Sequence, residues 1–206
     1  MLDIFLRGNN FAITLVTVNI KMQTNINKDN LTSLIYGCRQ NDRYAQNQLY
    51  KLLYRFVFGV CARYVKDEEE TKEVVQDVFY KTFTKIDKFG GELSFYSWIK
   101  KIAINTCIDR YRSKINDIPT TDLEEAFYSE QTASAMTDVD ADYLLHFIQQ
   151  LSPSYKVAFN MYAIDGYKYT EIAEILGISE GSVKSNISKA RMNVQKMIEN
   201  NQKVNG

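Results

Sequence analysis

The sequence has few of the residues that interrupt helices or cross-link small folds. It holds two prolines and nine glycines in 206 residues, and its longer segments repeat apolar side chains at helical spacing. Cys38, Cys61 and Cys107 are scattered, odd in number and never arranged as C-x-x-C. This arrangement argues against a disulfide framework and a zinc site, and favours a reducing cytoplasm. We therefore expect an all-α protein that works in the cytoplasm.

Residue patterns typical of enzymes are missing as well. We find no phosphate-binding glycine loop, no H-E-x-x-H motif and no context for a serine or cysteine nucleophile. The single histidine, His146, has no neighbouring cysteine or carboxylate cluster, so we interpret it as a helix surface or interface residue. We expect no catalytic residue, no metal site, no cofactor and no small-molecule substrate.

The formal net charge is zero, which is unusual for a protein that binds nucleic acid, but the charges are unevenly distributed. Residues 28–114 carry 16 basic and 11 acidic side chains. Residues 115–150 carry eight acidic side chains and no lysine or arginine, whereas residues 178–206 carry five basic and two acidic ones. Two basic segments therefore flank an acidic connector, and each could face a nucleic acid.

Periodicity and composition divide the chain into four parts. Residues 1–26 include an apolar run at 11–20, about half of the ~20 residues that a membrane span needs. We expect a poorly ordered extension there, and Met22 is a candidate for the native first residue. Residues 27–114 and 139–206 predict two helical domains, and residues 115–138 predict a flexible acidic linker.

Helix-capping residues divide the first of these domains into helices. Asp42, Asp67 and Ser94 are suitable N-caps, and the helix that follows Asp67 is expected to end near Phe83. The helix that follows Ser94 combines aromatic and basic residues, a combination that suits single-stranded DNA. Its Phe95 and Trp98 fit a core better, whereas Tyr96 and the loop at 89–93 are the better candidates for contact with bases.

The second domain is expected to contain four helices and to end in a helix-turn-helix. Thr170 is a suitable N-cap for its third helix, Gly177 suits the turn, and Ser179 suits the cap of the last helix. One face of that last helix repeats apolar residues, namely Val183, Ile187, Ala190, Val194 and Ile198. The opposite face carries Ser182, Lys184, Ser185, Ser188, Lys189 and Arg191. A polar, basic second helix of this kind fits the major groove of DNA.

Other interpretations of this organisation remain open. The chain could be a two-domain regulator whose first domain binds a ligand or dimerises, and such a protein would bind DNA alone. It could instead be an enzyme, although no catalytic motif supports this. A helical interaction protein that uses the helix-turn-helix only for packing would lack the salt-sensitive DNA affinity that phosphate contacts produce.

The chain resembles the extracytoplasmic-function class of sigma factors, the minimal two-domain members of the bacterial sigma-seventy family. Four blocks carry the resemblance, in the order and spacing of that family. They read A-Q-N-Q-L-Y-K-L-L-Y-R-F from Ala45, E-V-V-Q-D-V-F-Y-K-T-F from Glu73, F-G-G-E-L-S-F-Y-S-W-I-K-K-I-A-I-N-T-C-I-D-R-Y-R from Phe89, and L-S-P-S-Y-K-V-A-F from Leu151 with G-Y-K-Y-T-E-I-A-E-I-L-G-I-S-E-G-S-V-K-S from Gly166. Through their order and spacing, the resemblance extends over nearly everything after Asn27.

This resemblance implies a transcription initiation factor rather than an enzyme. Its partners would be core RNA polymerase, promoter DNA that is double-stranded upstream and single-stranded at the melted element, and an anti-sigma factor that is usually membrane-anchored. It would work in the cytoplasm, at the nucleoid. By position, the resemblance assigns polymerase binding to Gln76, Asp77 and Lys81, minus-ten binding to Tyr96, Lys100, Lys101 and Asn105, and minus-thirty-five binding to Ser182, Lys184, Ser185, Ser188, Lys189 and Arg191.

Two positions depart from the pattern of the family. Gly90 stands where relatives usually carry an arginine, and Asn186 replaces the last arginine of the recognition-helix motif. We expect one contact fewer at the melted strand and weaker phosphate anchoring upstream.

Overall fold

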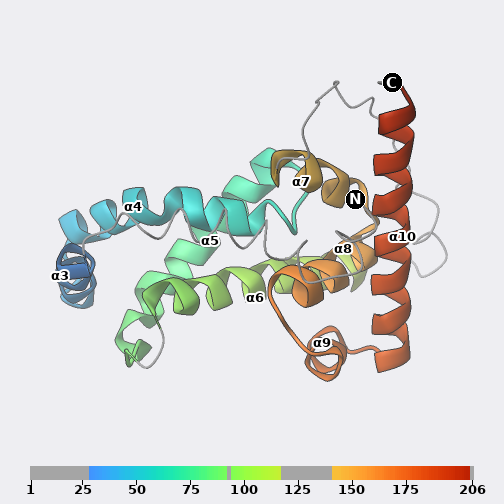
Figure 1. Cartoon of the computed structure of the whole chain (residues 1–206). Helices are drawn as coiled ribbons and strands as arrows, with labels where there is room; N and C mark the ends of the chain where they lie inside the picture. The colour runs from blue at the N-terminus through green and yellow to red at the C-terminus, as the bar shows by residue number, and fades with distance from the viewer. Residues whose placement is uncertain (1–27, 92–93, 117–140, 205–206) are drawn as a thin grey trace. The chain divides into compact units, whose positions relative to one another are not determined.

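The computed structural model describes residues 28–91, 94–116 and 141–204, and the regular structure within these ranges is entirely helical (Figure 1). The expected all-α class is therefore confirmed. The expected N-terminal extension and most of the expected linker lie outside the described residues. The chain separates into two compact units, with the boundary between Arg110 and Tyr111.

The first unit is built from four α-helices and one short 3-10 turn. These are α3 (Lys28–Arg39), α4 (Arg43–Cys61), α5 (Glu68–Lys85), the turn η1 (Ile86–Lys88) and α6 (Phe95–Asn116). The part of α6 up to Arg110 belongs to this unit. Helix α4 packs against both α3 and α5, and η1 also packs against α3 and α5. The three expected N-caps are present, because the side-chain oxygens of Asp42, Asp67 and Ser94 each accept a backbone N–H of the following helix.

The core of the first unit lies along the contact between α4 and α5 and includes side chains of α6. Leu49 and Leu53 of α4, Val74 and Val78 of α5 and Ile99 of α6 are fully buried. Burying a side chain of this size contributes about 1.5–3 kcal/mol each, so these five residues determine which faces of the helices remain exposed.

All three cysteines are buried in this unit. Cys38, with 2% of its surface exposed, lies near the end of α3. Burial, assisted by the nearby Asp42 carboxylate, raises the pKa of the Cys38 thiol to about 11. The thiol is therefore protonated at neutral pH and unreactive, as expected for a structural cysteine.

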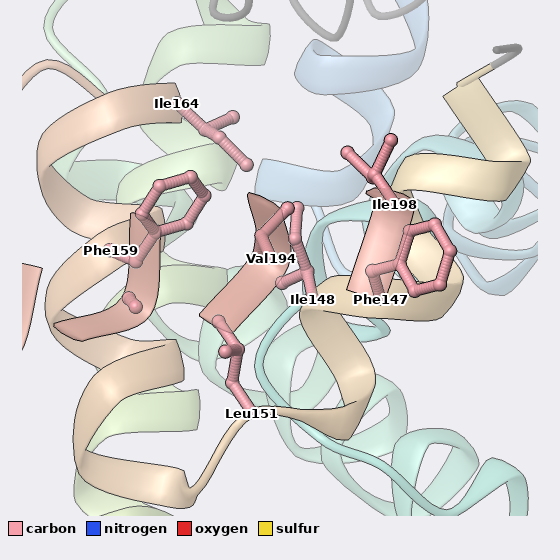
Figure 2. Close-up of a cluster of buried hydrophobic side chains, with 8 residues drawn as sticks. Phe147, Ile148, Leu151, Phe159, Ile164, Val194 and Ile198 are labelled. Atoms are coloured by element: carbon pink, nitrogen blue, oxygen red, sulfur yellow. The ribbon is translucent and has the colours of Figure 1, made fainter. Parts of the chain in front are cut away.

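The second unit contains the four predicted helices. Helix α7 (Ala141–Gln150) leads into α8 (Pro153–Phe159), which continues as a π-helical segment, η2 (Asn160–Ile164). Helix α9 (Tyr169–Leu176) and the long helix α10 (Glu180–Val204) complete it, and α10 packs against α7, α8 and α9. Eight apolar side chains from α7, the connection after it, α8, η2 and α10 form a buried cluster, seven of them labelled in Figure 2: Phe147, Ile148, Leu151, Phe159, Ile164, Ala190, Val194 and Ile198.

The turn between α9 and α10 has the geometry that the sequence predicts, but the start of α9 does not. Gly177 has a φ of 68°, in the left-handed region that glycine adopts without strain. Helix α9 begins at Tyr169, with Lys168 at the N-cap position, so the prediction that Thr170 is the cap is wrong. The Lys168 N–H donates instead to the Glu171 carboxylate at 2.7 Å.

The close approach of α3 and α4 depends on a glycine. A Cβ atom built on Gly37 would lie 2.6 Å from the Cβ of Ala45, and neither atom can rotate away from the other. Gly59, in the last turn of α4, has no such neighbour within 4 Å. Gly37 is therefore needed for the packing of two helices, whereas Gly59 has room for a larger side chain, although both lie in helices.

Alanine at these two positions should change stability in opposite directions. We expect Gly37→Ala to lower the free energy of unfolding by about 1–3 kcal/mol, because the added methyl overpacks the contact. Gly59→Ala should raise it by about 0.5–1 kcal/mol, because alanine is the better helix former. Urea unfolding followed by the fluorescence of Trp98, the single tryptophan, measures both. Equal effects of the two substitutions would contradict the packing assigned to Gly37.

Candidate polymerase and nucleic-acid interfaces

Helix α5 presents a polar surface opposite its buried face. Gln76 and Asp77 are both exposed, whereas Val75 and Val78 beside them are buried. Since the apolar side is used in the core, these two side chains must point outward. The structure thus brings Gln76 and Asp77 together on one accessible surface.

Lys81, the third residue expected on this surface, has a partner within the unit. Its Nζ lies 3.3 Å from the Oδ2 of Asp109 on α6, and 34% of the side chain is exposed. Arg110 reinforces the same connection through Glu70 at 3.1 Å and Glu73 at 2.6 Å. Lys81 therefore links α5 to α6, and its expected polymerase contact stays a prediction.

Tyr80 is an interface candidate that the sequence analysis did not identify. It lies one helical turn after Gln76, and 71% of its surface is exposed. Exposed aromatic residues surrounded by polar neighbours are common anchors of protein interfaces. Its helical spacing from Gln76 is the signal that could have revealed it.

The structure buries Tyr96, which the sequence analysis favours for base contact. Only 9% of its surface is exposed, and its ring meets that of Phe56 edge-on at 5.1 Å. Its hydroxyl is buried without a hydrogen-bond partner among the described residues, and burial raises its pKa. The ring is closed to base stacking in this arrangement, and a role for Tyr96 in DNA binding stays a prediction.

The other three expected minus-ten residues lie on a more accessible part of α6. Lys101 and Asn105 are exposed and one helical turn apart, so their side chains are neighbours. Lys100 is half-buried. The pair formed by Lys101 and Asn105 offers a cation and an amide, which suit a phosphate and a base edge respectively.

Three aromatic rings surround the start of α6. The rings of Phe89, Phe95 and Trp98 contact one another at centroid distances of 5.1–5.5 Å. Arg39 of α3 donates from Nη2 to the Phe89 carbonyl at 2.6 Å, which fixes the start of the loop that follows. Phe95 is buried as expected, whereas Trp98 is half-buried. The expected base-contacting loop is described only through Gly91, because residues 92–93 lie outside the described part.

Helix α10 separates its apolar and polar residues as the sequence predicts. Val183, Ile187, Ala190 and Val194 are buried. The Oγ of Ser179 accepts the Ser182 N–H at 3.0 Å and so caps the helix. The six residues predicted to contact the upstream element are all exposed on α10: Ser182, Lys184, Ser185, Ser188, Lys189 and Arg191.

Each of the three cations among these six residues lies over the ring of a tyrosine. The Lys184 Nζ lies 5.6 Å from the ring centroid of Tyr169, and the Arg191 Cζ lies 5.5 Å from that of Tyr162. The Lys189 Nζ lies 5.6 Å from the ring of Tyr155. These distances are within the range of cation–π attraction, worth about 0.5–1 kcal/mol at an exposed site.

Two of the three tyrosines also stack on each other. The rings of Tyr162 and Tyr169 are 4.6 Å apart and nearly parallel, at 7°. A hydrogen bond to Tyr162, with burial as the second cause, raises the pKa of Tyr169. The contacts of Tyr162 and Tyr169 with each other and with the cations could not be predicted from the sequence, because these residues come from η2, α9 and α10, which share no periodic pattern.

The described residues offer neither a metal-binding cluster nor a membrane-spanning helix. They contain no group of three or more His, Cys, Asp or Glu side chains that could hold a metal ion. No helix in the described part of the chain combines the length and apolar character that crossing a membrane requires.

Comparison with known families yields two matches in one chain. Residues 49–115 match the model of Sigma-70 region 2, and residues 141–194 match that of Sigma-70, region 4. The chain is 30% identical over 180 residues to the ECF RNA polymerase sigma-E factor of Haemophilus influenzae, covering 82% of this chain and 93% of the relative. It is 26% identical to the RNA polymerase sigma-H factor of Pseudomonas aeruginosa, covering 81% and 92%.

A solved structure gives a weaker likeness. The sigma factor RpoE from Bartonella quintana, solved in complex with the anti-sigma factor NepR, is 20% identical and gives a TM-score of 0.47. The match covers 74% of this chain and 96% of that one.

Removing the Tyr96 hydroxyl tests its buried environment. We expect Tyr96→Phe to raise the free energy of unfolding by about 1 kcal/mol, because a buried hydroxyl without a partner carries an uncompensated desolvation cost. Tyr96→Ala, the matched control that also removes the ring, should destabilise by about 3 kcal/mol or more. Urea unfolding measures both, and a loss of stability in Tyr96→Phe would show that the hydroxyl has a partner.

Proposed function

The chain belongs to the extracytoplasmic-function class of RNA polymerase sigma factors, and we propose that its two helical units divide the work of such a factor between them. A sigma factor binds core RNA polymerase and directs promoter recognition and transcription initiation. We assign polymerase binding and the melted minus-ten strand to residues 27–114, and the upstream duplex to residues 139–206. Residues 115–138 would connect the two. The observation that carries this proposal is the occurrence of region 2 and region 4 in one chain, in that order.

The exposed surface of α5 is the proposed contact with the polymerase. Gln76 and Asp77 offer an amide and a carboxylate at the centre of this surface. The adjoining Tyr80 offers a large ring that is exposed to solvent in the free protein and would be covered by the polymerase. Rings of this kind contribute strongly when a partner covers them, because their burial removes much apolar area from water. Lys81 would take part at the edge, where it must share its charge with Asp109.

The exposed part of α6 is the proposed contact with the melted strand. Lys101 would meet a phosphate and Asn105 the edge of an unpaired base, with Lys100 beside them. Tyr96 belongs to the same proposal, because its hydroxyl has no partner among the described residues and would gain one if DNA reached it. Extruding a base costs a few kcal/mol, which contacts of this kind can offset.

The exposed face of α10 is the proposed contact with the upstream element. Serine hydroxyls near the start of a recognition helix can donate to or accept from base edges in the major groove. Lys184, Lys189 and Arg191 would contact the phosphates on either side, and these contacts would make the affinity depend on salt. The exposed positions are Ser182, Lys184, Ser185, Ser188, Lys189 and Arg191.

The remaining parts of the proposal concern partners and place. Sigma factors in general are not enzymes, and we infer that this chain itself catalyses no reaction. We propose an anti-sigma factor as its regulator, anchored in the membrane as is usual for the class. Its work would take place in the cytoplasm, at the nucleoid, where core polymerase and promoters meet.

Reconstitution tests the assigned function directly. The purified chain mixed with bacterial core RNA polymerase should co-elute with it and direct transcription from specific start sites on genomic fragments of the source organism. Neither component alone should produce those transcripts. If the chain bound specific DNA by itself and ignored the polymerase, the function of a two-domain regulator would replace this proposal.

Charge reversal on α5 tests the proposed polymerase surface. We expect Asp77→Lys and Tyr80→Ala each to weaken binding to core polymerase about tenfold, because one introduces a repulsive charge and the other removes the ring. Asp87→Lys, a charge reversal at an exposed residue of η1, is the matched control and should bind normally. Competition with a labelled wild-type chain measures all three affinities. Normal affinity in both α5 variants would place the polymerase contact elsewhere.

A further inference from the structure

The stacked rings of Tyr162 and Tyr169 lie beside the proposed DNA-binding face of α10. Tyr162 comes from the π-helical segment η2, and Tyr169 is the first residue of α9. The pair contacts the cationic groups of Lys184 and Arg191, one ring to each. We call Tyr162 and Tyr169 together the tyrosine shelf.

The spacing on α10 explains why one shelf can serve both cations. Lys184 and Arg191 are seven residues apart, so they lie on the same side of the helix and about 10.5 Å apart along its axis. Ser188 lies between them on that side, four residues after Lys184 and three before Arg191. The three exposed residues thus form a polar row along the edge of α10 that adjoins the shelf.

An aromatic ring restrains a cation without cancelling its charge. An acidic partner would also hold a lysine in place, but it would compete directly with a phosphate. Glu180 is such a partner for Lys184, yet the distance between Nζ and Oε2 is 3.9 Å, at the limit for an ion pair. The face of a tyrosine attracts the cation through its quadrupole and leaves the full positive charge available.

We propose that Tyr162 and Tyr169 are positioning residues that hold Lys184 and Arg191 in the direction of DNA phosphates. The inference rests on the proposed function of α10. A free lysine or arginine side chain loses much rotamer freedom when it binds, and a side chain that is already restrained loses less. The shelf therefore raises DNA affinity although neither ring needs to touch the DNA.

A double-mutant cycle separates positioning from mere stability. The holoenzyme, reconstituted with bacterial core polymerase, is titrated onto a promoter fragment that it selects from genomic DNA. We expect Tyr162→Leu to weaken binding about threefold, the size of one lost cation–π restraint. In a chain that already carries Arg191→Ala, the same change should have almost no effect. An equal loss in both backgrounds, or no loss in either, would overturn the proposal.

Two matched variants complete the test. Tyr162→Phe keeps the ring and should keep wild-type affinity, whereas a loss equal to that of Tyr162→Leu would overturn the role of the ring. Tyr167→Leu removes a half-buried tyrosine of the connection between η2 and α9, outside the shelf, and it should not weaken binding. A loss in Tyr167→Leu as large as in Tyr162→Leu would also overturn the proposal.

Salt dependence distinguishes a failure of this inference from a failure of the proposed function. If Arg191 meets a phosphate, Arg191→Ala lowers the slope of log affinity against log salt by about 1. An unchanged slope in Arg191→Ala would refute the proposed phosphate contact and the shelf's role for Arg191 with it. A lowered slope in Arg191→Ala, together with wild-type affinity in Tyr162→Leu, would refute the shelf alone.

Discussion

The burial of one side of α10 is the constraint on which the second unit depends. Val183, Ile187, Ala190, Val194 and Ile198 follow one another at helical spacing and are almost completely covered. Rotating α10 by one residue would expose this apolar row and bury polar and charged side chains in its place, Lys184 or Lys189 among them, at a cost of several kcal/mol. The outward direction of the serines and cations is therefore a consequence of packing in the core, and no separate interaction is needed to impose it.

In the first unit, too, packing in the core determines which surfaces are exposed, but ion pairs between helices contribute as well. The apolar contact between α4 and α5 fixes the outward surface of α5, and ion pairs then join α5 to α6. Because Arg110, Glu73, Lys81 and Asp109 are at least one-third exposed, those pairs contribute little energy individually, but they fix the relative position of the two helices. The proposed polymerase surface on α5 and the proposed strand-binding surface on α6 are thus held in a fixed position relative to each other within one unit.

Most features that depend on local pattern could be predicted from the sequence, the cap at Thr170 being the exception, and features that depend on tertiary contact could not. Helix periodicity, the caps at Asp42, Asp67, Ser94 and Ser179, and the turn at Gly177 are properties of a few consecutive residues, and all are present. The burial of Tyr96 and the partner of Lys81 depend on helices far away in the chain. The sequence shows Tyr96 in a basic, aromatic segment, but only the position of Phe56 determines that its ring is covered. The tyrosine shelf is a contact of the same long-range kind.

The π-helical segment η2 has a consequence for how this chain can change. The Asp165 N–H bonds to the Asn160 carbonyl, five residues earlier, so this turn holds one residue more than an α turn. A residue at the end of this turn is therefore displaced by about 100° around the helix axis relative to its position in a continuous α-helix. Phe159 precedes the extra residue, whereas Ile164, which meets it in the same core, lies at the end of the wide turn. The extra residue of η2 therefore sets which side chains face the core and which lie beside α10. A chain shorter by one residue here could not keep both Ile164 in the core and the Tyr162 ring beside α10.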